Sequence, residues 1–524
     1  MKSPIIIGTR GSELALWQAN FTKNELEKHG FTAELKIIKT KGDATQQWNL
    51  SFDKIEGKGF FTKELEDALL ANEIDLAVHS CKDLPTESPN GLTIAAYSKR
   101  ANPFDILLIK KESVDEKKIV KLKENAIVGT SSARRKAQLL ALRPDIDILD
   151  LRGNVPTRVQ KLNENNYDAI VLASAGLERL NINLNEFEKV ELSAPLFIPA
   201  PAQGVLAFQI RESDDEMKNI CSLLNDKDSS AISFIERKIL HDFEGGCQMP
   251  LGVYTEKIEN DFHVWISQAI AWNTFPKRMH FSIPENDLEK KLSALITKAK
   301  NAISSSVFIS SELKEDEYFC RALSAHHIPY HCESFIEFKA VNFDFPANAD
   351  WLFFSSKNGV KYFFNAYQND FRKSTIKLAA INQGTANAIH ELGFNTEFIG
   401  KGNDLYKITE QFDAIAKGKI VFPQASKSLQ SIQNNLKLNK NNESLVVYEN
   451  YPKQNIIERK ESILVFTSPM SAEAYFSKYQ IHDFQSVISI GNTTTKKIKT
   501  FNFKNVKTAF EPSYSALLDE IFSV

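Results

Sequence analysis

The sequence predicts an α/β protein with several domains. Short apolar stretches such as PIIIGTR (4–10) and EIDLAV (73–78) alternate with amphipathic stretches such as ELALWQANFTKNELEKHG (13–30). This alternation is typical of α/β units built around mostly parallel sheets. The chain has 524 residues, 43% of them hydrophobic, which is enough for three or more hydrophobic cores.

Breaks in this alternation divide the first half. IAAYSKRANPFDILLIKK (94–111) breaks at Asn102–Pro103, because proline restricts the residue before it, and then resumes as a strand-like run, so we expect it to cross between two lobes. LFIPAPAQGVLAFQIR (196–211) then returns to the first lobe. A third region combines a helix at 229–243, the turn GGCQMPLG (245–252) and a strand at 262–272. We expect domains at 1–99 with 200–222, at 100–199 and at 223–303.

The second half follows a serine-rich linker (304–306) and repeats itself loosely. LFFSSKNGVKYFF (352–364) matches LVFTSPMSAEAYF (464–476), and LAAINQGTANAI (378–389) matches VISIGNTTTKKI (487–498). The repeat predicts two similar α/β lobes, at 304–338 with 453–524 and at 339–452. Each matching stretch has a polar turn, mostly of Ser, Thr or Asn, between a strand and a helix. Such turns can bind an anion or simply cap the helix, and the sequence leaves both interpretations open.

The composition excludes several classes of protein. The net charge of −2 gives no global basic field for nucleic acid or anionic membrane, and no segment approaches the length of a transmembrane helix. We expect a cytoplasmic monomer with no nucleic-acid or membrane partner. Five cysteines without CxxC spacing predict neither a disulfide framework nor a metal site. Cys247, in GGCQMPLG, therefore needs an explanation of its own.

One local stretch is strongly basic. Between residues 134 and 161 the chain has three aspartates and seven cations, namely Arg134, Arg135, Lys136, Arg143, Arg152, Arg158 and Lys161. Arg135 and Lys136 could form a solvated helix face. The alternative is a ligand with many carboxylates, because the planar guanidinium binds carboxylates through two bonds. Nucleic acid fits the charge less well, because the stretch lacks interleaved aromatic residues.

HSCKDLP (79–85) puts Lys82 and Asp83 directly after an apolar strand. An aspartate before Leu-Pro is usually a turn former. In a cleft lined with arginine, however, its carboxylate could stabilise a developing cation or transfer a proton. The sequence alone does not decide between these roles.

Eight motifs, taken together and in order, resemble the porphobilinogen deaminase (hydroxymethylbilane synthase) family over residues 3–300. They are RGSELALWQA, GKGFFTKELEDALL, HSCKDLP, VGTSSARRKAQL, LRGNVPTRVQKL, YDAIVLASAGLERL, PAPAQG and EGGCQMPLG. Residues 305–524 resemble the uroporphyrinogen III synthase family through DWLFFSSKNGV, ILVFTSP and SIGNTTT. The resemblance implies two periplasmic-binding-protein-like α/β lobes, a small α+β domain that carries a cofactor cysteine, and a two-lobed α/β synthase half.

The deaminase resemblance implies a transferase of haem biosynthesis that condenses four porphobilinogens into hydroxymethylbilane and releases ammonia. It assigns a covalent dipyrromethane cofactor to Cys247 and the catalytic carboxylate to Asp83, beside Lys82. The remaining cofactor-binding residues it implies are Arg134, Arg135, Ser132 and Thr130. The implied substrate-binding residues are Arg10, Ser12, Arg152, Arg158, Arg179 and Gln203, with Lys58 and Phe61 in a loop over the cleft. Cys81, Ala133 and Gln209 depart from the family pattern.

The synthase resemblance implies a lyase that closes hydroxymethylbilane into uroporphyrinogen III with the last pyrrole inverted. It gives Tyr448 a role in loss of the hydroxyl, and it implies carboxylate binding by Ser356, Ser468, Thr493 and Thr494. INQGTA lacks the family's usual glycine-proline, and YENYP lacks its usual threonine, so an inactive interaction domain is an alternative for this half. For the whole chain the alternative is a polyanion-binding solute or sensor module, which the GGC turn and the missing signal peptide disfavour.

Overall fold

The computed structural model describes residues 4–40, 62–164, 166–243, 249–301, 305–400, 405–428, 430–438 and 441–524. The chain forms two compact units. Unit 1 comprises Met1–Ser305, Lys314–Pro329 and Tyr514–Val524, and unit 2 comprises Ser306–Leu313 and Tyr330–Ser513. No helix in these described stretches is both long enough and apolar enough to cross a bilayer. The predicted α/β class is confirmed by the sheets and helices described below.

The first sheet of unit 1 has the strand order β2-β1-β3-β10-β4. β1 pairs in parallel with β2 and β3, whereas β10, far along the chain, lies antiparallel between β3 and β4. The strands are β1 (Ile5–Thr9), β2 (Ala33–Ile37), β3 (Leu76–Ser80), β4 (Leu92–Tyr97) and β10 (Leu206–Arg211). The accompanying helices are α1 (Glu13–Lys28), α3 (Lys63–Leu70) and α7 (Asp215–Ser222), and the short 3-10 helix η3 (Cys81–Asp83) follows β3.

The second sheet of unit 1 has the order β7-β6-β8-β5-β9. Alternate residues of β8 enter two different hydrophobic clusters: Val171 packs in one, and Ile170 and Leu172 pack in the other. Both faces are therefore covered, which explains the continuous apolar run of this strand. The strands are β5 (Asp105–Lys110), β6 (Ile127–Gly129), β7 (Asp147–Leu149), β8 (Ala169–Ala173) and β9 (Phe187–Leu192). The helices are α4 (Ala133–Leu142), α5 (Val155–Asn163) and α6 (Ser174–Leu180).

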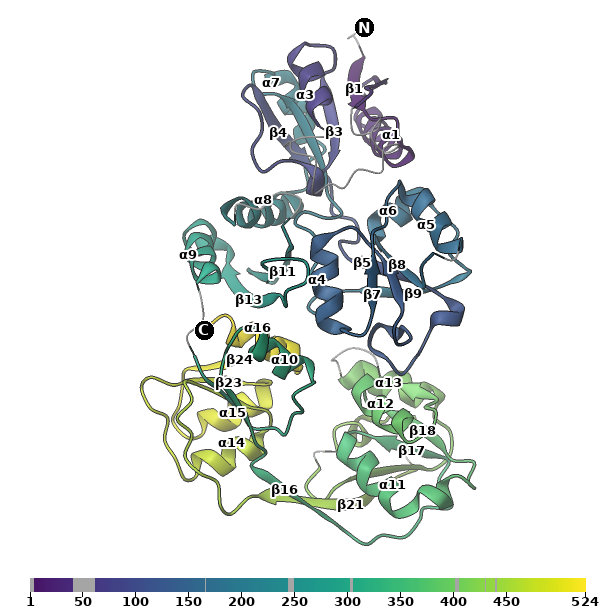
Figure 1. The fold of residues 1–524 in the computed structure, drawn as a ribbon, viewed down its shortest axis with the longest axis vertical. Coiled ribbons are helices and arrows are strands. Elements are labelled where there is room, and N and C mark those ends of the chain that lie inside the picture. The colour runs from purple at the N-terminus through teal and green to yellow at the C-terminus, as the bar shows by residue number, and fades with distance from the viewer. Residues whose placement is uncertain are drawn as a thin grey trace. The chain divides into compact units, whose positions relative to one another are not determined.

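The third sheet of unit 1 is an antiparallel meander, β11-β12-β13. Figure 1 shows it beside α8 and α9, which pack on β11 and β13 respectively. Two further helices of unit 1 follow segments of unit 2 in the chain: α10 comes after 306–313, and α16 comes after 330–513. The bounds are β11 (Leu251–Ile258), β12 (Asp261–Gln268), β13 (Lys277–Pro284), α8 (Lys227–Asp242), α9 (Leu288–Lys300), α10 (Tyr318–Ala325) and α16 (Tyr514–Ile521).

Unit 2 has a five-stranded parallel sheet with the order β15-β14-β22-β23-β24. Phe308, Phe335 and Tyr475 stack in its hydrophobic cluster. The strands are β14 (Val307–Ile309), β15 (Tyr330–Cys332), β22 (Ile463–Phe466), β23 (Ser486–Ser489) and β24 (Val506–Thr508), and the helices are α14 (Pro469–Phe476) and α15 (Asn492–Lys499).

The other sheet of unit 2 has six strands in the order β16-β21-β20-β17-β18-β19. Its strand β17 sends Leu352 and Phe354 into one cluster and Trp351 and Phe353 into another, so this sheet too is covered on both faces. The strands are β16 (Ile336–Ala340), β17 (Trp351–Phe354), β18 (Lys377–Ala380), β19 (Phe398–Ile399), β20 (Ile420–Ala425) and β21 (Asn442–Pro452). The helices are α11 (Lys357–Phe371), α12 (Gln383–Glu391) and α13 (Leu405–Ile415).

Candidate functional site

A cleft in unit 1 gathers polar side chains from the first two sheets. They follow the carboxyl ends of β1, β3, β6, β7 and β8, where open α/β sheets usually bind ligands. Five of the lining residues are cations and two are acids. The lining side chains that the sequence predicted are Arg10, Ser12, Lys82, Asp83, Arg135, Arg158, Arg179 and Gln203. The cleft is therefore built for an anionic ligand.

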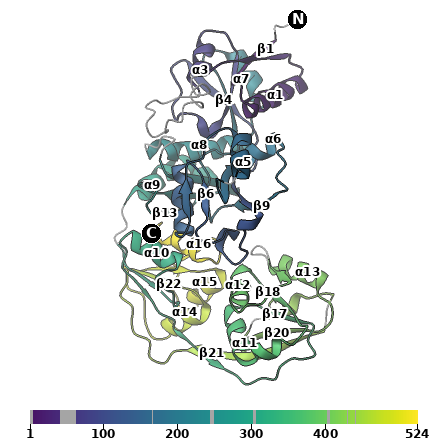
Figure 2. The same ribbon diagram turned by 45° about the vertical axis from the view of Figure 1, so that its right-hand side comes forward.

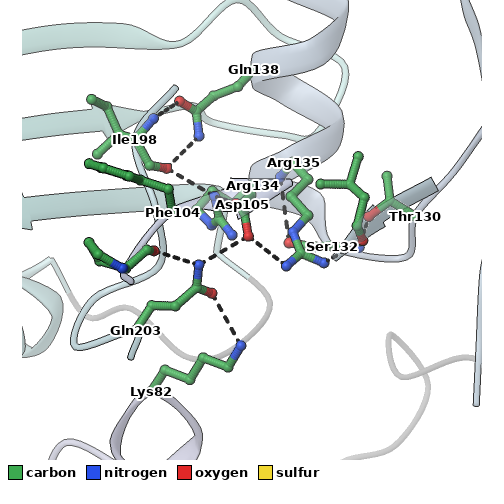
Figure 3. A network of polar contacts seen from close by, with 12 residues as sticks. Lys82, Phe104, Asp105, Thr130, Ser132, Arg134, Arg135, Gln138, Ile198 and Gln203 are labelled. Carbon is green, nitrogen blue, oxygen red and sulfur yellow. Dashed lines mark hydrogen bonds and ion pairs between the residues drawn. The ribbon is translucent and has the colours of Figure 1, made fainter. Parts of the chain in front are cut away.

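A buried carboxylate holds the arginine pair of α4 in place. Asp105, the first residue of β5, is fully buried and accepts hydrogen bonds from Arg134 Nη1 at 2.8 Å and Arg135 Nη2 at 2.7 Å. Gln203 Nε2 donates to it at 3.0 Å, and Gln203 Oε1 accepts from Lys82 Nζ at 3.1 Å (Figure 3). Burial opposes ionisation, but the two arginines outweigh it and hold the pKa of Asp105 well below its ordinary value. Asp105 is thus a fixed negative charge beneath the cleft.

The first turn of α4 is shaped by the hydroxyl-rich turn before it. Ser132 caps the helix, its Oγ accepting from the Arg135 N–H at 3.5 Å, and Thr130 Oγ1 accepts from the Ser132 N–H at 3.3 Å. Arg135 lines the cleft, whereas Thr130, Ser132 and Arg134 lie outside its lining, as does Arg152. Because Arg135 is only 6% exposed, its interpretation as part of a solvated helix face is wrong.

Lys82 lies between this network and the cleft. Burial lowers the pKa of Lys82 to about 8; the Asp83 carboxylate opposes the shift and the Arg135 guanidinium adds to it. A group with this pKa exchanges its proton close to neutral pH, as general acid–base catalysis requires.

Two further arginines are held by backbone carbonyls. Arg158 Nε donates to Gly153 O and Arg179 Nη2 donates to Gly204 O, each at 2.8 Å. Burial lowers the pKa of both guanidinium groups to about 10, and for Arg158 the charge of Arg135 adds to the effect. Arg158 and Arg179 are therefore poorly hydrated, and Arg158 is also repelled by Arg135, so carboxylates of a ligand would stabilise these cations.

Asp83 is exposed at the end of η3. The loop after it is fixed by Arg237 of α8, whose Nη2 donates to Pro85 O at 2.7 Å and to Thr86 O at 3.3 Å. The neighbouring thiol of Cys81 is buried, and burial raises its pKa to about 11. Cys81 therefore stays protonated and unreactive near neutral pH.

A second buried carboxylate fixes α8. Glu236 accepts from both terminal nitrogens of Arg100, at 2.8 and 3.2 Å, and from the backbone N–H groups of Ala202 at 2.5 Å and Thr255 at 2.7 Å. These bonds join α8, β11 and the loop that carries Gln203. The predicted cofactor cysteine Cys247 and the predicted loop residues Lys58 and Phe61 lie outside the described residues.

The region that contains this cleft is similar to known proteins. Residues 5–219 match the family model "Porphobilinogen deaminase, dipyromethane cofactor binding domain". A porphobilinogen deaminase from a Nitratiruptor species is 48% identical over 261 residues, which cover 49% of this chain and 80% of the relative. The chain belongs to the porphobilinogen deaminase family. Another deaminase, from Chlorobium phaeobacteroides, is 42% identical over 266 residues, or 50% of this chain and 82% of the relative.

The second half matches a different family model. Residues 321–519 match "Uroporphyrinogen-III synthase HemD". A uroporphyrinogen-III synthetase structure from Helicobacter pylori aligns with 42% of this chain and 99% of its own, with 22% identity and a TM-score of 0.34, a likeness too distant to carry weight. The protein therefore combines a porphobilinogen deaminase region with a uroporphyrinogen-III synthase region, both of tetrapyrrole biosynthesis.

In the synthase region the structure brings two of the predicted residues together. The Tyr448 hydroxyl lies 3.3 Å from Ser356 Oγ, which also caps α11 by accepting from the Gly359 N–H at 3.0 Å. Tyr448 is 6% exposed and stacks on Tyr362 at 5.2 Å between ring centres. Burial raises the pKa of Tyr448, and the bond to Ser356 opposes the shift. The phenol therefore remains protonated at neutral pH and can donate a proton.

The other three synthase residues lie at the starts of helices that follow strands of the five-stranded sheet. Ser468 caps α14, its Oγ accepting from the Ser471 N–H at 3.0 Å. Thr493 is exposed and Thr494 is buried in the first turn of α15, which Gly491 caps. A cavity of unit 2, between β21 and α14, is lined by none of the five predicted synthase residues.

Sequence reasoning missed Asp105 and Glu236. Asp105 opens DILLIK, a strand whose next four positions are apolar. A charge at the start of a strand buried on both faces needs a partner, and the partners follow about 30 residues later in the arginine pair. Glu236 gave no comparable signal, because its partner Arg100 is 136 residues away.

Proposed function

We propose that unit 1 condenses porphobilinogen into hydroxymethylbilane on a dipyrromethane attached to Cys247. The observation that carries the proposal is the exposed carboxylate of Asp83, which lines the cleft together with five cations at strand ends. Each pyrrole of the product bears acetate and propionate groups, so a growing chain presents many carboxylates to such a surface. The domain boundaries given above for the deaminase and synthase regions are part of this proposal.

The cleft fits a bound dipyrromethane by the chemistry of its donors. Arg135 and Lys82, which line the cleft, supply N–H groups to its carboxylates, and Asp83 accepts from its pyrrole N–H groups. Arg134, Ser132 and Thr130 lie outside the lining in this structure, and the proposal assigns them to the cofactor as further donors beside Arg135. Bound there, the cofactor supplies a covalent primer for chain growth. The proposed substrate-binding residues are Arg10, Ser12, Arg158, Arg179 and Gln203 of the cleft lining, with Arg152 outside it. Lys58 and Phe61 are proposed to take part as well, although they lie outside the described residues.

Asp83 and Lys82 have different roles in the proposed reaction. Loss of ammonia from porphobilinogen leaves a cationic pyrrole, and the Asp83 carboxylate stabilises this charge electrostatically. Lys82, with its pKa near 8, protonates the departing amine or takes up the proton that the ring loses when the new bond forms. The Gln203 bridge to Asp105 keeps Lys82 oriented throughout.

Cys247 as the attachment point is supported by its neighbours in the chain. α8 ends at Asp242, five residues before Cys247 in the sequence, and Arg237 of α8 donates to Pro85 O in the loop that follows Asp83. In the sequence two glycines, which have no Cβ, precede Cys247, as suits a side chain that carries a bulky group.

The intact mass of the purified protein tests this proposal. We expect the wild-type chain to carry the added mass of two pyrrole units, and Cys247→Ser to lack it. An unmodified wild-type mass combined with tight binding of a polycarboxylate would instead support the solute-binding alternative.

We propose further that unit 2 closes hydroxymethylbilane to uroporphyrinogen III, with the Tyr448 phenol assisting loss of the hydroxyl. Ser356, Ser468, Thr493 and Thr494 bind carboxylates through hydroxyls and helix N-termini. The test is to incubate the full chain with porphobilinogen and identify the isomer that accumulates. Isomer III supports the proposal, and isomer I alone supports an inactive interaction domain.

A further inference from the structure

Two helices that follow segments of unit 2 in the chain, α10 and α16, belong to the deaminase unit, unit 1. α10 and α16 fall within or at the edge of the residues that match the synthase family model, yet both are part of unit 1. Figures 1 and 2 show them beside β13, and α16 packs directly on that strand. Between Ala516 and Ser523 no residue is more than 9% exposed. A helix buried on every side is a core element rather than a surface attachment.

A buried ion pair joins α16 to β13. Arg278 Nε donates to Asp519 Oδ1 at 2.9 Å and Arg278 Nη2 donates to Asp519 Oδ2 at 3.1 Å, with the side chains 3% and 2% exposed. Arg278 Nη1 also donates to Leu196 O at 3.0 Å, and Tyr318 of α10 is a further hydrogen-bond partner. The Arg278 guanidinium thus connects the third sheet, the loop before β10, and the helices α10 and α16.

Neighbouring contacts extend this surface. His280 Nδ1 lies 3.1 Å from Glu520 Oε1, and the His280 N–H donates to Ser523 Oγ at 3.2 Å. On α10, Arg321 Nη2 donates to Ala141 O of α4 at 2.7 Å, and its guanidinium lies 5.7 Å from the centre of the Phe275 ring. The polar groups are matched in charge and geometry, which an accidental apolar contact would not require.

We propose that β13, with Arg278 at its centre, is a docking surface whose partner is the α10–α16 pair of the same chain, so that the two enzymes stay joined independently of their linker. The chain passes between units four times, at residues 305/306, 313/314, 329/330 and 513/514. Cutting the chain just before the first crossing leaves α10 and α16 docked on β13.

Cleavage of the folded full-length chain tests this. A protease recognition sequence replaces residues 302–304, the folded protein is cut, and the fragments are followed by size-exclusion chromatography. We expect them to elute together. Arg278→Met on one fragment and Asp519→Asn on the other each leave a buried group without its partner, and each should weaken association by roughly a hundredfold or more.

The double variant Arg278→Met/Asp519→Leu should associate more tightly than either single variant, because apolar groups replace both charges. Lys291→Met, which removes an exposed ion pair on α9, is the matched control, and its fragments should elute together as the wild-type fragments do. Wild-type fragments that separate at once would overturn the proposal. So would Arg278→Met and Asp519→Asn proteins that hold together as well as the control. Elution does not depend on catalysis, so failure of the proposed enzymatic function leaves this test intact.

Discussion

The two regions hold their candidate site residues by different means. In the deaminase cleft the side chains are cations, and buried groups such as Asp105 and Gln203 fix them from below. In the synthase region Ser356 and Ser468 are neutral hydroxyls, held by the helices that they cap. A charged site needs counter-charges from elsewhere in the fold, whereas a capping hydroxyl is positioned by its own helix. Variants should therefore affect the deaminase site through electrostatics and the synthase site through local geometry.

The largest effect is expected at Asp83. Asp83→Asn removes the charge that stabilises the developing cation and should lower the rate of porphobilinogen consumption by roughly 10²–10⁴-fold. Because Asp83 is exposed, urea unfolding should be unchanged. Glu87→Gln, another exposed acid four residues on, is the control and should keep full activity. If Asp83→Asn consumes porphobilinogen at the wild-type rate, Asp83 is a turn former and not a catalytic residue.

Removing the buried counter-charge should destabilise the protein. Asp105→Leu leaves Arg134 and Arg135 without their shared partner, so we expect the free energy of unfolding of unit 1 to fall by about 3–5 kcal/mol. Urea denaturation measures it. Asp215→Asn, which loses only an exposed ion pair, should be indistinguishable from wild type. An Asp105→Leu protein as stable as that control would show that the cations need no internal partner.

The free energy of unfolding should depend on pH through the titration of Lys82. Its pKa is lowered to about 8 in the folded chain and is near 10.4 when unfolded. The unfolded state binds more protons between these values, so stability should rise from about pH 8 toward pH 10. Unfolding measured at several pH values in wild type and Lys82→Met isolates this group. The free energy of unfolding of the wild type, relative to that of Lys82→Met, should rise across this pH window. A constant difference would mean that Lys82 is not desolvated.

Loss of the Tyr448 hydroxyl should have a smaller effect. Tyr448→Phe keeps the stacking on Tyr362 and removes the bond to Ser356, so we expect stability to change by about 0.5–1.5 kcal/mol. Ring closure to isomer III should slow roughly tenfold, less than for a dedicated acid–base group. Tyr362→Phe is the matched control. If Tyr448→Phe and Tyr362→Phe close the ring at equal rates, the Tyr448 hydroxyl takes no part in the reaction.

The smallest effect separates capping from anion binding at Ser468. Ser468→Ala should lower stability by about 1 kcal/mol, because the cap of α14 is lost, whereas Ser468→Asn keeps a capping side chain. If the hydroxyl also binds a substrate carboxylate, Ser468→Asn should raise KM for hydroxymethylbilane with stability unchanged. An unchanged KM would leave Ser468 as a cap alone.

Much of the fold could be predicted from the sequence, because strand and helix periods are local signals. The break at Asn102–Pro103 lies between β4 and β5, and the serine-rich turns at 356 and 468 do begin helices. Of the arginines of the cleft, Arg135 and Arg158 were visible as part of a local excess of charge. Asp105 was missed, because its pairing with Arg134 and Arg135 and its bond from Gln203, 98 residues away, appear only in the folded chain. The membership of α10 and α16 in unit 1 was equally hidden, since their sequence matches the synthase family.

The Arg278–Asp519 pair also sets an order of events during synthesis. The two residues are 241 positions apart, and all of unit 2 lies between β13 and α16 in the chain. At about 5–20 residues per second, a ribosome needs roughly 10–50 s to go from one to the other. Throughout that time the third sheet of the deaminase waits for its last helix. Unit 1 is therefore complete only after all of unit 2 has been synthesised.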